Sequence, residues 1–166
     1  MRDRLIEERF ETPFGWGVLV LADDLPVALE LPDEERPPVN VGGGAWRELL
    51  ERYFAGEQVV FPLDVMRHCV ALGLSRFESA VLAELAAVPY GRAVSYGELA
   101  AAAGHPNAYR AVGSVMGRNA LPVILPCHRV IRSDGDLGQY GDDPRWKRRL
   151  LTLEGYFESD DRQEKR

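Results

Sequence analysis

The chain has 166 residues, 46% hydrophobic and 28% charged, which is the composition of a globular protein and excludes the disordered and membrane classes. No run of about 18 apolar residues predicts a membrane span, and the charged N-terminal residues predict no signal peptide. Two cysteines are too few for a disulfide framework, so we expect a reducing, cytoplasmic location where free thiols persist.

The net charge of −6 is unevenly distributed. Residues 1–64 carry 14 acidic and 6 basic side chains, a net charge of −8, whereas residues 65–166 carry 12 acidic and 14 basic ones, a net charge of +2. Attraction to phosphate is local, because salt screens charges over about 8–10 Å. The charge pattern therefore permits a DNA-binding C-terminal half without proving one.

The N-terminal part predicts a small sheet and a helix. Residues 15–21 and 26–31 are β-type runs that flank a short polar turn, which predicts a hairpin. A proline- and glycine-rich loop follows over 32–44. Apolar residues recur at helical spacing over 45–56, and 59–61 predict another strand. This acidic part contains no catalytic constellation, so we expect it to be structural support.

Residues 62–74 are expected to be a connector, although they contain the adjacent pair His68 and Cys69. A zinc site needs about four ligands at suitable spacing. The chain has only three histidines and two cysteines, and neither a CxxC nor an HxxxH pattern. We therefore expect no metal site, and a structural role for both residues of the pair.

Three helices are expected next. The pattern Ser-x-x-Glu, in which each side chain caps the other residue's backbone, begins at Ser75 and again at Ser95. The first helix ends before a Pro-Tyr-Gly sequence, the second ends at Gly104, and a third, capped by Asn107, extends to about Gly117. Two short helices joined by a tight glycine-containing turn predict a helix-turn-helix.

The third helix has two unlike faces. The face expected to pack inward consists of Ala108, Ala111, Val112, Val115 and Met116. The opposite face carries one long cation and otherwise small residues: Arg110, Gly113, Ser114 and Gly117. A helix that reads bases in the major groove usually carries more polar side chains than this one. The face therefore suits either sequence-tolerant approach to the minor groove of DNA or close packing against another helix.

The segment 125–131 contains the candidate nucleophile, Cys127, between a proline and a histidine. A cysteine beside a histidine on rigid backbone is typical of a reactive thiol. Free cysteine is also among the most buried residue types, so a structural role stays open on these residues alone. Asp143 and Pro144 begin a last helix, which ends at Glu154, and residues 158–166 are expected to form a solvated tail.

Together these motifs resemble the O6-alkylguanine-DNA alkyltransferases, also called methylated-DNA–protein-cysteine methyltransferases. The matching motifs are Pro89-Tyr90-Gly91, Ser95-Tyr96-Gly97-Glu98-Leu99-Ala100, Arg110-Ala111-Val112-Gly113, Asn119, Pro126-Cys127-His128-Arg129-Val130, Gly138 to Gly141, and Glu154-Gly155. The resemblance covers residues 75–155 closely, whereas residues 1–64 match the family only in layout.

The resemblance implies an α+β fold in two domains. Residues 1–74 would form a small N-terminal α/β domain with an antiparallel sheet, followed by the connector. Residues 75–157 would form a winged-helix-like helix-turn-helix domain that carries the active site, with the tail after it.

The implied reaction is irreversible transfer of the alkyl group from O6 of guanine to Cys127, once per molecule and without a cofactor. By resemblance, His128 takes the thiol proton through a water molecule and Glu154 orients the histidine, which follows the nucleophile–base–orienter arrangement of catalytic triads. Tyr96 is expected to protonate the leaving guanine. Asn119 is expected to tie the recognition helix to the active-site turn.

The guanine has to be flipped out of the duplex to reach a buried thiol. By resemblance, Arg110 enters the stack and occupies the vacated space. The expected substrate-binding residues are Arg110, Pro122, Val130, Tyr140 and Gly141, the last of which replaces a serine of some relatives. The expected DNA-binding residues are Arg110, Ala111, Gly113, Ser114, Gly117, Arg118 and Arg129.

The expected partner is double-stranded DNA containing O6-alkylguanine, bound by a monomer. Reaction with O4-alkylthymine, the largest adduct accepted and cooperative binding along DNA stay open. The main alternative is an alkyltransferase-like protein that binds the lesion without reacting, but such proteins lack the nucleophilic cysteine. A transcription regulator would need base-reading side chains on its recognition helix, and a papain-type hydrolase would need that family's local pattern.

Overall fold

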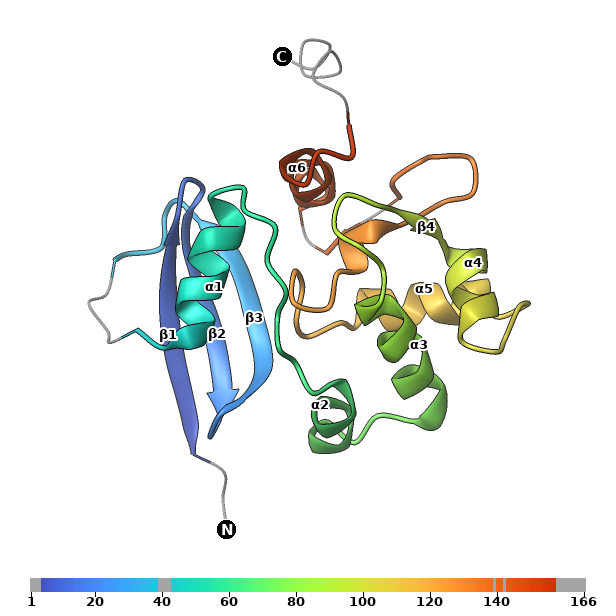
Figure 1. The fold of residues 1–166 in the computed structure, drawn as a ribbon, viewed down its shortest axis with the longest axis horizontal. Helices are drawn as coiled ribbons and strands as arrows, with labels where there is room; N and C mark the ends of the chain where they lie inside the picture. Colours follow the sequence, from blue (N-terminus) through green and yellow to red (C-terminus); the bar gives the residue numbers. More distant parts are fainter. Residues whose placement is uncertain (1–3, 39–42, 139, 142, 158–166) are drawn as a thin grey trace.

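A computed structural model describes residues 4–38, 43–138, 140–141 and 143–157 of the protein. A three-stranded sheet with one helix makes up one side of the molecule, and the remaining helices lie beside it (Figure 1). This mixture of helices with a small antiparallel sheet confirms the predicted α+β class. Within the described ranges, every helix is too short or too polar to cross a membrane.

The sheet is antiparallel, with its strands in the order β1-β2-β3. Strands β2 (Gly15–Ala22) and β3 (Leu25–Asp33) form the predicted hairpin. The sequence does not predict β1 (Leu5–Thr12), because half of its side chains are charged and Phe10 is its only buried residue. The period-two alternation that identifies a strand is therefore weak there.

Helix α1 (Ala45–Phe54) forms over the predicted range and lies across one face of the sheet. It buries Leu50, Tyr53 and Phe54, and it packs against β1. The predicted apolar spacing thus identifies the inward face of this helix correctly.

One prediction for the following segment is wrong, and the segment also contains a helix that the sequence does not predict. Residues 59–61 form no strand, and Val60 is 85% exposed, so the apolar run has no sheet to join. The expected connector contains a short helix, α2 (Val65–Ala71), whose first turn is capped by the side chain of Asp64. Nδ1 of His68 hydrogen-bonds to the carbonyl of Pro26, and the described residues contain no cluster of three metal-ligating side chains.

Helices α3 (Arg76–Ala86), α4 (Tyr96–Ala102) and α5 (Tyr109–Gly117) follow as predicted. Both reciprocal caps are present, at Ser75 and at Ser95. Helix α4 ends before Gly104, whose φ of +85° is a left-handed conformation that glycine adopts without steric cost. The glycine thereby turns the chain sharply into the second helix of the helix-turn-helix.

Two details of α5 correct the prediction. The helix begins after Ala108, which has no side-chain cap, so Asn107 is not its capping residue. The reason is that the amide of Ala108 hydrogen-bonds to the carbonyl of His105, which extends the preceding turn. Val112, Val115 and Met116 are buried, but Ala111 is exposed, because it lies beyond the edge of the buried stripe. The buried stripe is thus narrower than the predicted inward face.

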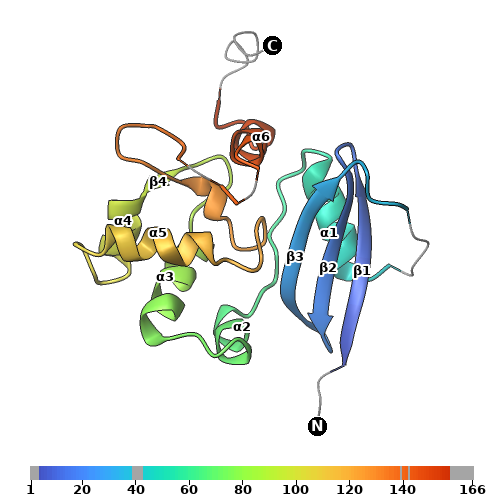
Figure 2. The ribbon, with the colours of Figure 1, turned by 180° about the vertical axis from the view of Figure 1, so that it is seen from behind.

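The C-terminal elements hold the candidate nucleophile beside the helix-turn-helix. A short 3-10 helix, η1 (Cys127–Arg129), leads into β5 (Val130–Ile131), which pairs in parallel with β4 (Val94–Ser95). Helix α6 (Arg145–Leu153) forms as predicted and packs against η1. Figure 2 shows the loop between α5 and η1 facing β3, where Leu29 donates a backbone hydrogen bond of 2.8 Å to Ala120.

One hydrophobic cluster joins the two sides of the molecule. It includes Phe10 and Leu50 near the sheet as well as Leu99 and Leu150 among the C-terminal helices. Since this cluster crosses the boundary at residue 74, the division into two domains stays a prediction. The expected tail, 158–166, lies outside the described residues.

Candidate active site

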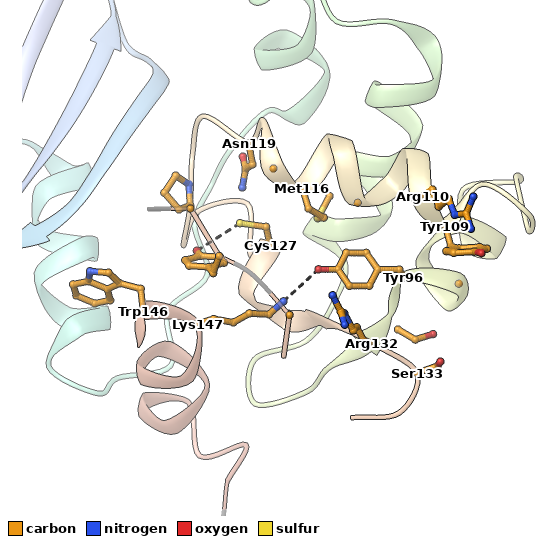
Figure 3. A pocket seen from close by; sticks show the side chains of 18 of the residues that line it. Tyr96, Tyr109, Arg110, Met116, Asn119, Cys127, Arg132, Ser133, Trp146 and Lys147 are labelled. Carbon is orange, nitrogen blue, oxygen red and sulfur yellow. Dashed lines mark hydrogen bonds between the residues drawn. The ribbon is translucent and has the colours of Figure 1, made fainter. Parts of the chain in front are cut away.

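Cys127 is the first residue of η1, directly after Pro126, and it lines a pocket of about 1070 Å³ (Figure 3). The pocket lies where the start of α4, one face of α5, the loop after β5 and the start of α6 meet. It brings together many of the residues predicted from the sequence: Tyr96, Arg110, Gly113, Gly117, Asn119, Pro122, Cys127, Tyr140 and Gly141.

The thiol of Cys127 is neutral at rest. Burial raises its pKa, whereas hydrogen bonds with Tyr140 and Asn119 and the charge of Lys147 act in the opposite direction. Sγ donates a hydrogen bond of 3.5 Å to the hydroxyl of Tyr140. Because only a thiolate is a good nucleophile, a base must remove the proton of this thiol.

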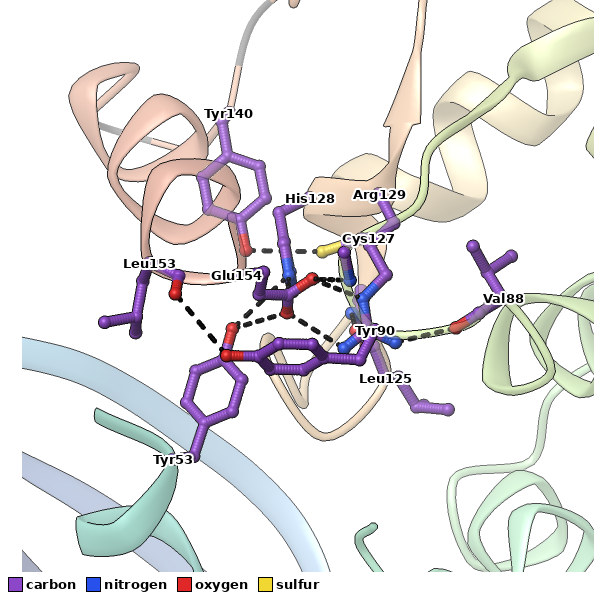
Figure 4. A network of polar contacts seen from close by, with 12 residues as sticks. Tyr53, Val88, Tyr90, Leu125, Cys127, His128, Arg129, Tyr140, Leu153 and Glu154 are labelled. Carbon is purple, nitrogen blue, oxygen red and sulfur yellow. Dashed lines mark hydrogen bonds and ion pairs between the residues drawn. The ribbon is translucent and has the colours of Figure 1, made fainter. Parts of the chain in front are cut away.

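His128 is fully buried, and its ring is held by Glu154 (Figure 4). Burial lowers the pKa of His128 against the opposing effect of the Glu154 carboxylate, which favours the neutral ring. The distance between Nε2 and Oε1 of Glu154 is 2.7 Å. Since a carboxylate only accepts hydrogen bonds, Nε2 carries the proton and Nδ1 keeps a lone pair. Nδ1 has no partner among the described residues, so it is the atom that can act as a base.

The carboxylate of Glu154 accepts hydrogen bonds from several segments of the chain. Arg129 donates to both oxygens, at 2.8 and 2.9 Å, and the backbone of Gly91 donates to Oε2 at 3.1 Å. Tyr53 donates to Oε1 at 2.7 Å. Burial alone would raise the pKa of Glu154, but the hydrogen bonds from His128 and Arg129 outweigh it and lower the pKa to about 2.

Arg129 corrects the predicted set of DNA-binding residues. Its side chain is buried, pairs with Glu154 and donates a hydrogen bond of 2.7 Å to the carbonyl of Val88. A guanidinium held in this way does not reach a phosphate, so Arg129 is part of the support of the active site.

The exposed surface of α5 carries other residues of that set. Arg110, Ala111, Ser114 and Gly117 are exposed along it, and Arg118 follows directly. Arg118 pairs with Glu78 at 3.0 Å, and its side chain remains 63% exposed. Gly113 lies against Tyr96, since a Cβ at this position would be 3.9 Å from the tyrosine ring. The small residues thus leave the backbone of α5 accessible at the rim of the pocket.

Asn119 connects the end of α5 to the turn before Cys127. Its Nδ2 donates to the carbonyl of Leu125 at 2.8 Å, and its Oδ1 accepts from the amide of Leu121 at 3.0 Å. The two bonds span a segment in which Val123 has a φ of +76°, an unusual conformation for a β-branched residue. The asparagine therefore helps to hold a strained turn behind the nucleophile.

Lys147 and Tyr96 meet in the wall of the pocket. Nζ of Lys147 donates to the hydroxyl of Tyr96 at 3.5 Å and to the carbonyl of Val130 (Figure 3). Burial lowers the pKa of Lys147 to about 8, and it raises the pKa of Tyr96. Val130 is one of the expected substrate-binding residues, and its carbonyl thus already has one donor and keeps a second lone pair.

Sequence reasoning missed two residues of this site. Lys147 carries a readable signal, because it lies at helical spacing with Leu150 and Leu151 on the buried face of α6. Tyr53 carries a weaker signal: it lies on the apolar face of α1, where a buried hydroxyl needs a partner that the sequence does not identify.

The structure predicts that Lys147 promotes ionisation of the thiol. Replacing Lys147 with Met removes a cation near Cys127, so we expect the thiol pKa to rise by about half a unit to one unit. The pH dependence of iodoacetamide reaction, in a Cys69→Ser background, measures this pKa. The control is Arg148→Met, since Arg148 lies next along α6 and packs over the ring of Phe157. If the pH dependence of the iodoacetamide reaction is the same in Lys147→Met as in the wild type, the prediction is wrong.

Comparisons with known proteins agree on one family. The family model described as "6-O-methylguanine DNA methyltransferase, DNA binding domain" matches residues 76–156. The methylated-DNA–protein-cysteine methyltransferase of Mycobacterium leprae is 36% identical over 87% of this chain and 88% of its own length. The enzyme of that name from Salmonella typhimurium is 34% identical over 93% of this chain and 98% of its own. The solved structure of Mycobacterium tuberculosis OGT in complex with DNA matches 90% of this chain and 92% of that one, with a TM-score of 0.72 and 31% identity.

Proposed function

Because the chain belongs to the methylated-DNA–protein-cysteine methyltransferase family, we propose that it repairs O6-alkylguanine in DNA by moving the alkyl group to Sγ of Cys127. The observation that carries this proposal is that Cys127 lines a large pocket and that the next residue, His128, is bound to the carboxylate of Glu154. Double-stranded DNA is the expected partner, and a reducing cytoplasm would keep the thiol available.

The first step is removal of the thiol proton. His128 receives it at Nδ1 through a bridging water molecule, because Nε2 is already protonated and bound to Glu154 and Nδ1 has no partner among the described residues. The buried carboxylate stabilises the imidazolium that forms, as the third member of a triad does. The thiolate then attacks the alkyl carbon, so that an S–C bond forms as the C–O6 bond breaks.

The second requirement is protonation of the leaving guanine. The electron pair of the broken C–O6 bond remains on the base, and the hydroxyl of Tyr96, at the pocket wall, donates its proton. Lys147 donates to the oxygen of Tyr96 and, with a pKa of about 8, can restore the tyrosine proton near neutral pH. The guanine thereby leaves as a neutral base.

Access to the pocket requires base flipping. An alkylated guanine inside the duplex cannot reach the thiol of Cys127, a residue that is only 6% exposed. Arg110 is exposed at the rim of the pocket, on the small-residue face of α5, where its side chain can fill the space that the base leaves. Sequence-tolerant contact through Gly113, Ser114 and Gly117 suits a repair protein that must act at any lesion.

The product explains why each molecule acts once. A thioether on Cys127 has no good leaving group, so the alkyl group stays on the sulfur. The alternative, a lesion-binding protein without transfer activity, is disfavoured because Cys127 is present and the next residue, His128, is bound to Glu154.

Mass spectrometry tests the proposed function. After incubation with a duplex containing one O6-methylguanine, the protein should gain one methyl group, and peptide mapping should place it on Cys127 and not on Cys69. An undamaged duplex is the control, and the yield should equal the amount of protein. Binding to the lesion with no change in protein mass would support the alternative and overturn the transfer proposal.

A further inference from the structure

Tyr53 comes from α1, on the sheet side of the molecule, yet its hydroxyl lies in the polar network of the active site (Figure 4). The side chain is fully buried, and Oη is 2.7 Å from Oε1 of Glu154 and 3.4 Å from Nε2 of His128. Rings of Phe54, Phe61 and Tyr90 surround its ring, with centroid distances of 5.3, 5.9 and 6.2 Å. The packing of the ring thus fixes the position of the hydroxyl.

The hydroxyl shares one acceptor atom with the catalytic histidine. Oε1 of Glu154 accepts from Tyr53, from Nε2 of His128 and from Nη2 of Arg129. Each donor withdraws part of the charge of that oxygen, so the bond from Tyr53 reduces the charge available to an imidazolium. Other charged and titratable groups act on this histidine and carboxylate from neighbouring elements: Arg129 of η1, Lys147 of α6, Tyr90 before β4 and Tyr140 in the pocket loop.

Building on the proposed function, we propose that Tyr53 is a positioning residue for alkyl transfer. Its hydroxyl holds Oε1 of Glu154 against Nε2 of His128 and limits the charge on that oxygen. The ring of His128 therefore stays neutral, with Nδ1 free to take the thiol proton. The N-terminal part of the chain thus tunes the reactive centre in addition to supporting it.

Replacing Tyr53 with Phe tests this role, because it removes the hydroxyl and keeps the packed ring. Oε1 retains its donors from His128 and Arg129, so no buried acceptor is left unpaired. The matched control is Tyr90→Phe, since the hydroxyl of Tyr90 donates to the backbone carbonyl of Leu153 and not to the carboxylate.

Three measurements report on the protonation of His128. We expect Tyr53→Phe to raise the titration midpoint of His128, followed by NMR, by about half a unit to one unit, because the freed carboxylate stabilises the imidazolium better. The acid limb of the reaction rate with free O6-benzylguanine should move upward equally. At pH 7, the proton on Nε2 should move downfield as its hydrogen bond strengthens. Only three histidines contribute signals, which makes assignment practical.

The outcomes separate tuning from mere packing. A lower melting temperature with an unchanged Nε2 proton resonance and an unchanged acid limb would overturn the role of Tyr53. Equal shifts in Tyr90→Phe would overturn it too, since the effect would not depend on the bond to Glu154. If the wild-type protein accepts no methyl group from DNA, the proposed function fails, and the NMR comparison still decides whether Tyr53 tunes His128.

Discussion

Replacing Glu154 with Gln should slow alkyl transfer to Cys127 by about 10²–10⁴-fold. The carboxylate only accepts hydrogen bonds, which keeps the proton of His128 on Nε2 and leaves Nδ1 as the base. A glutamine amide can instead donate to Nε2, which would move the proton to Nδ1. The histidine would then lack a lone pair at the atom that has to accept the thiol proton.

The same substitution should destabilise the protein by about 3–5 kcal/mol, because it leaves the buried guanidinium of Arg129 without its charged partner. The effect has a defined pH range. The pKa of Glu154 is lowered from 4.5 to about 2, so its stabilising contribution is complete above about pH 4.5 and is lost as the pH falls toward 2. Between pH 4.5 and 2, the free energy of unfolding of the wild type should fall by about 3 kcal/mol. The Glu154→Gln variant should not show this fall, because it lacks the carboxylate at every pH.

Both effects are measurable on the free protein. Transfer from O6-benzylguanine gives the rate without a contribution from DNA binding, and urea denaturation at several pH values gives the free energy of unfolding. The control is Glu84→Gln, at an exposed position on α3, which should change neither quantity. If Glu154→Gln remains folded and reacts within about threefold of the wild-type rate, the triad assignment fails.

Elements whose signals are local could be predicted from the sequence. The reciprocal caps at Ser75 and Ser95 each lie within one helical turn, and both helices begin where these caps predict. The hairpin of β2 and β3 and the helix α6 likewise follow from short apolar patterns. Cys127 and His128 were found because their motif is contiguous along the chain.

Features that depend on distant partners could not be predicted from the sequence. Tyr53 and Glu154 are separated by 101 positions, and no local pattern connects a tyrosine on an apolar helix face with that carboxylate. The alternation of apolar and polar residues in β1 is weak, so the strand depends on its pairing with β2. From the sequence, Arg129 is expected to bind DNA. Only its burial beside Glu154 reveals its structural role.

Replacing Arg110 with Ala should reduce transfer from duplex O6-methylguanine by about 10²-fold. Extrusion of a base costs a few kcal/mol of stacking and pairing, and without the arginine nothing fills the vacated space. The loss should be smaller on a single-stranded oligonucleotide, where the base is already unpaired. The rate with free O6-benzylguanine should stay within about threefold of wild type, because Cys127, His128 and Glu154 are unchanged.

Arg118→Ala distinguishes a role in base flipping from simple attraction to phosphate. Arg118 directly follows α5 and is largely exposed, so its loss should weaken duplex and single-stranded binding alike and reduce the salt dependence of binding. The loss of transfer rate in Arg110→Ala should instead depend on whether the alkylated base is paired. An Arg110→Ala variant that loses the same factor on duplex, single strand and free base would assign the arginine to the pocket itself. Equal losses on the duplex and the single strand alone would assign it to the phosphate backbone. Only a loss concentrated on the duplex supports Arg110 as the residue that replaces the flipped guanine.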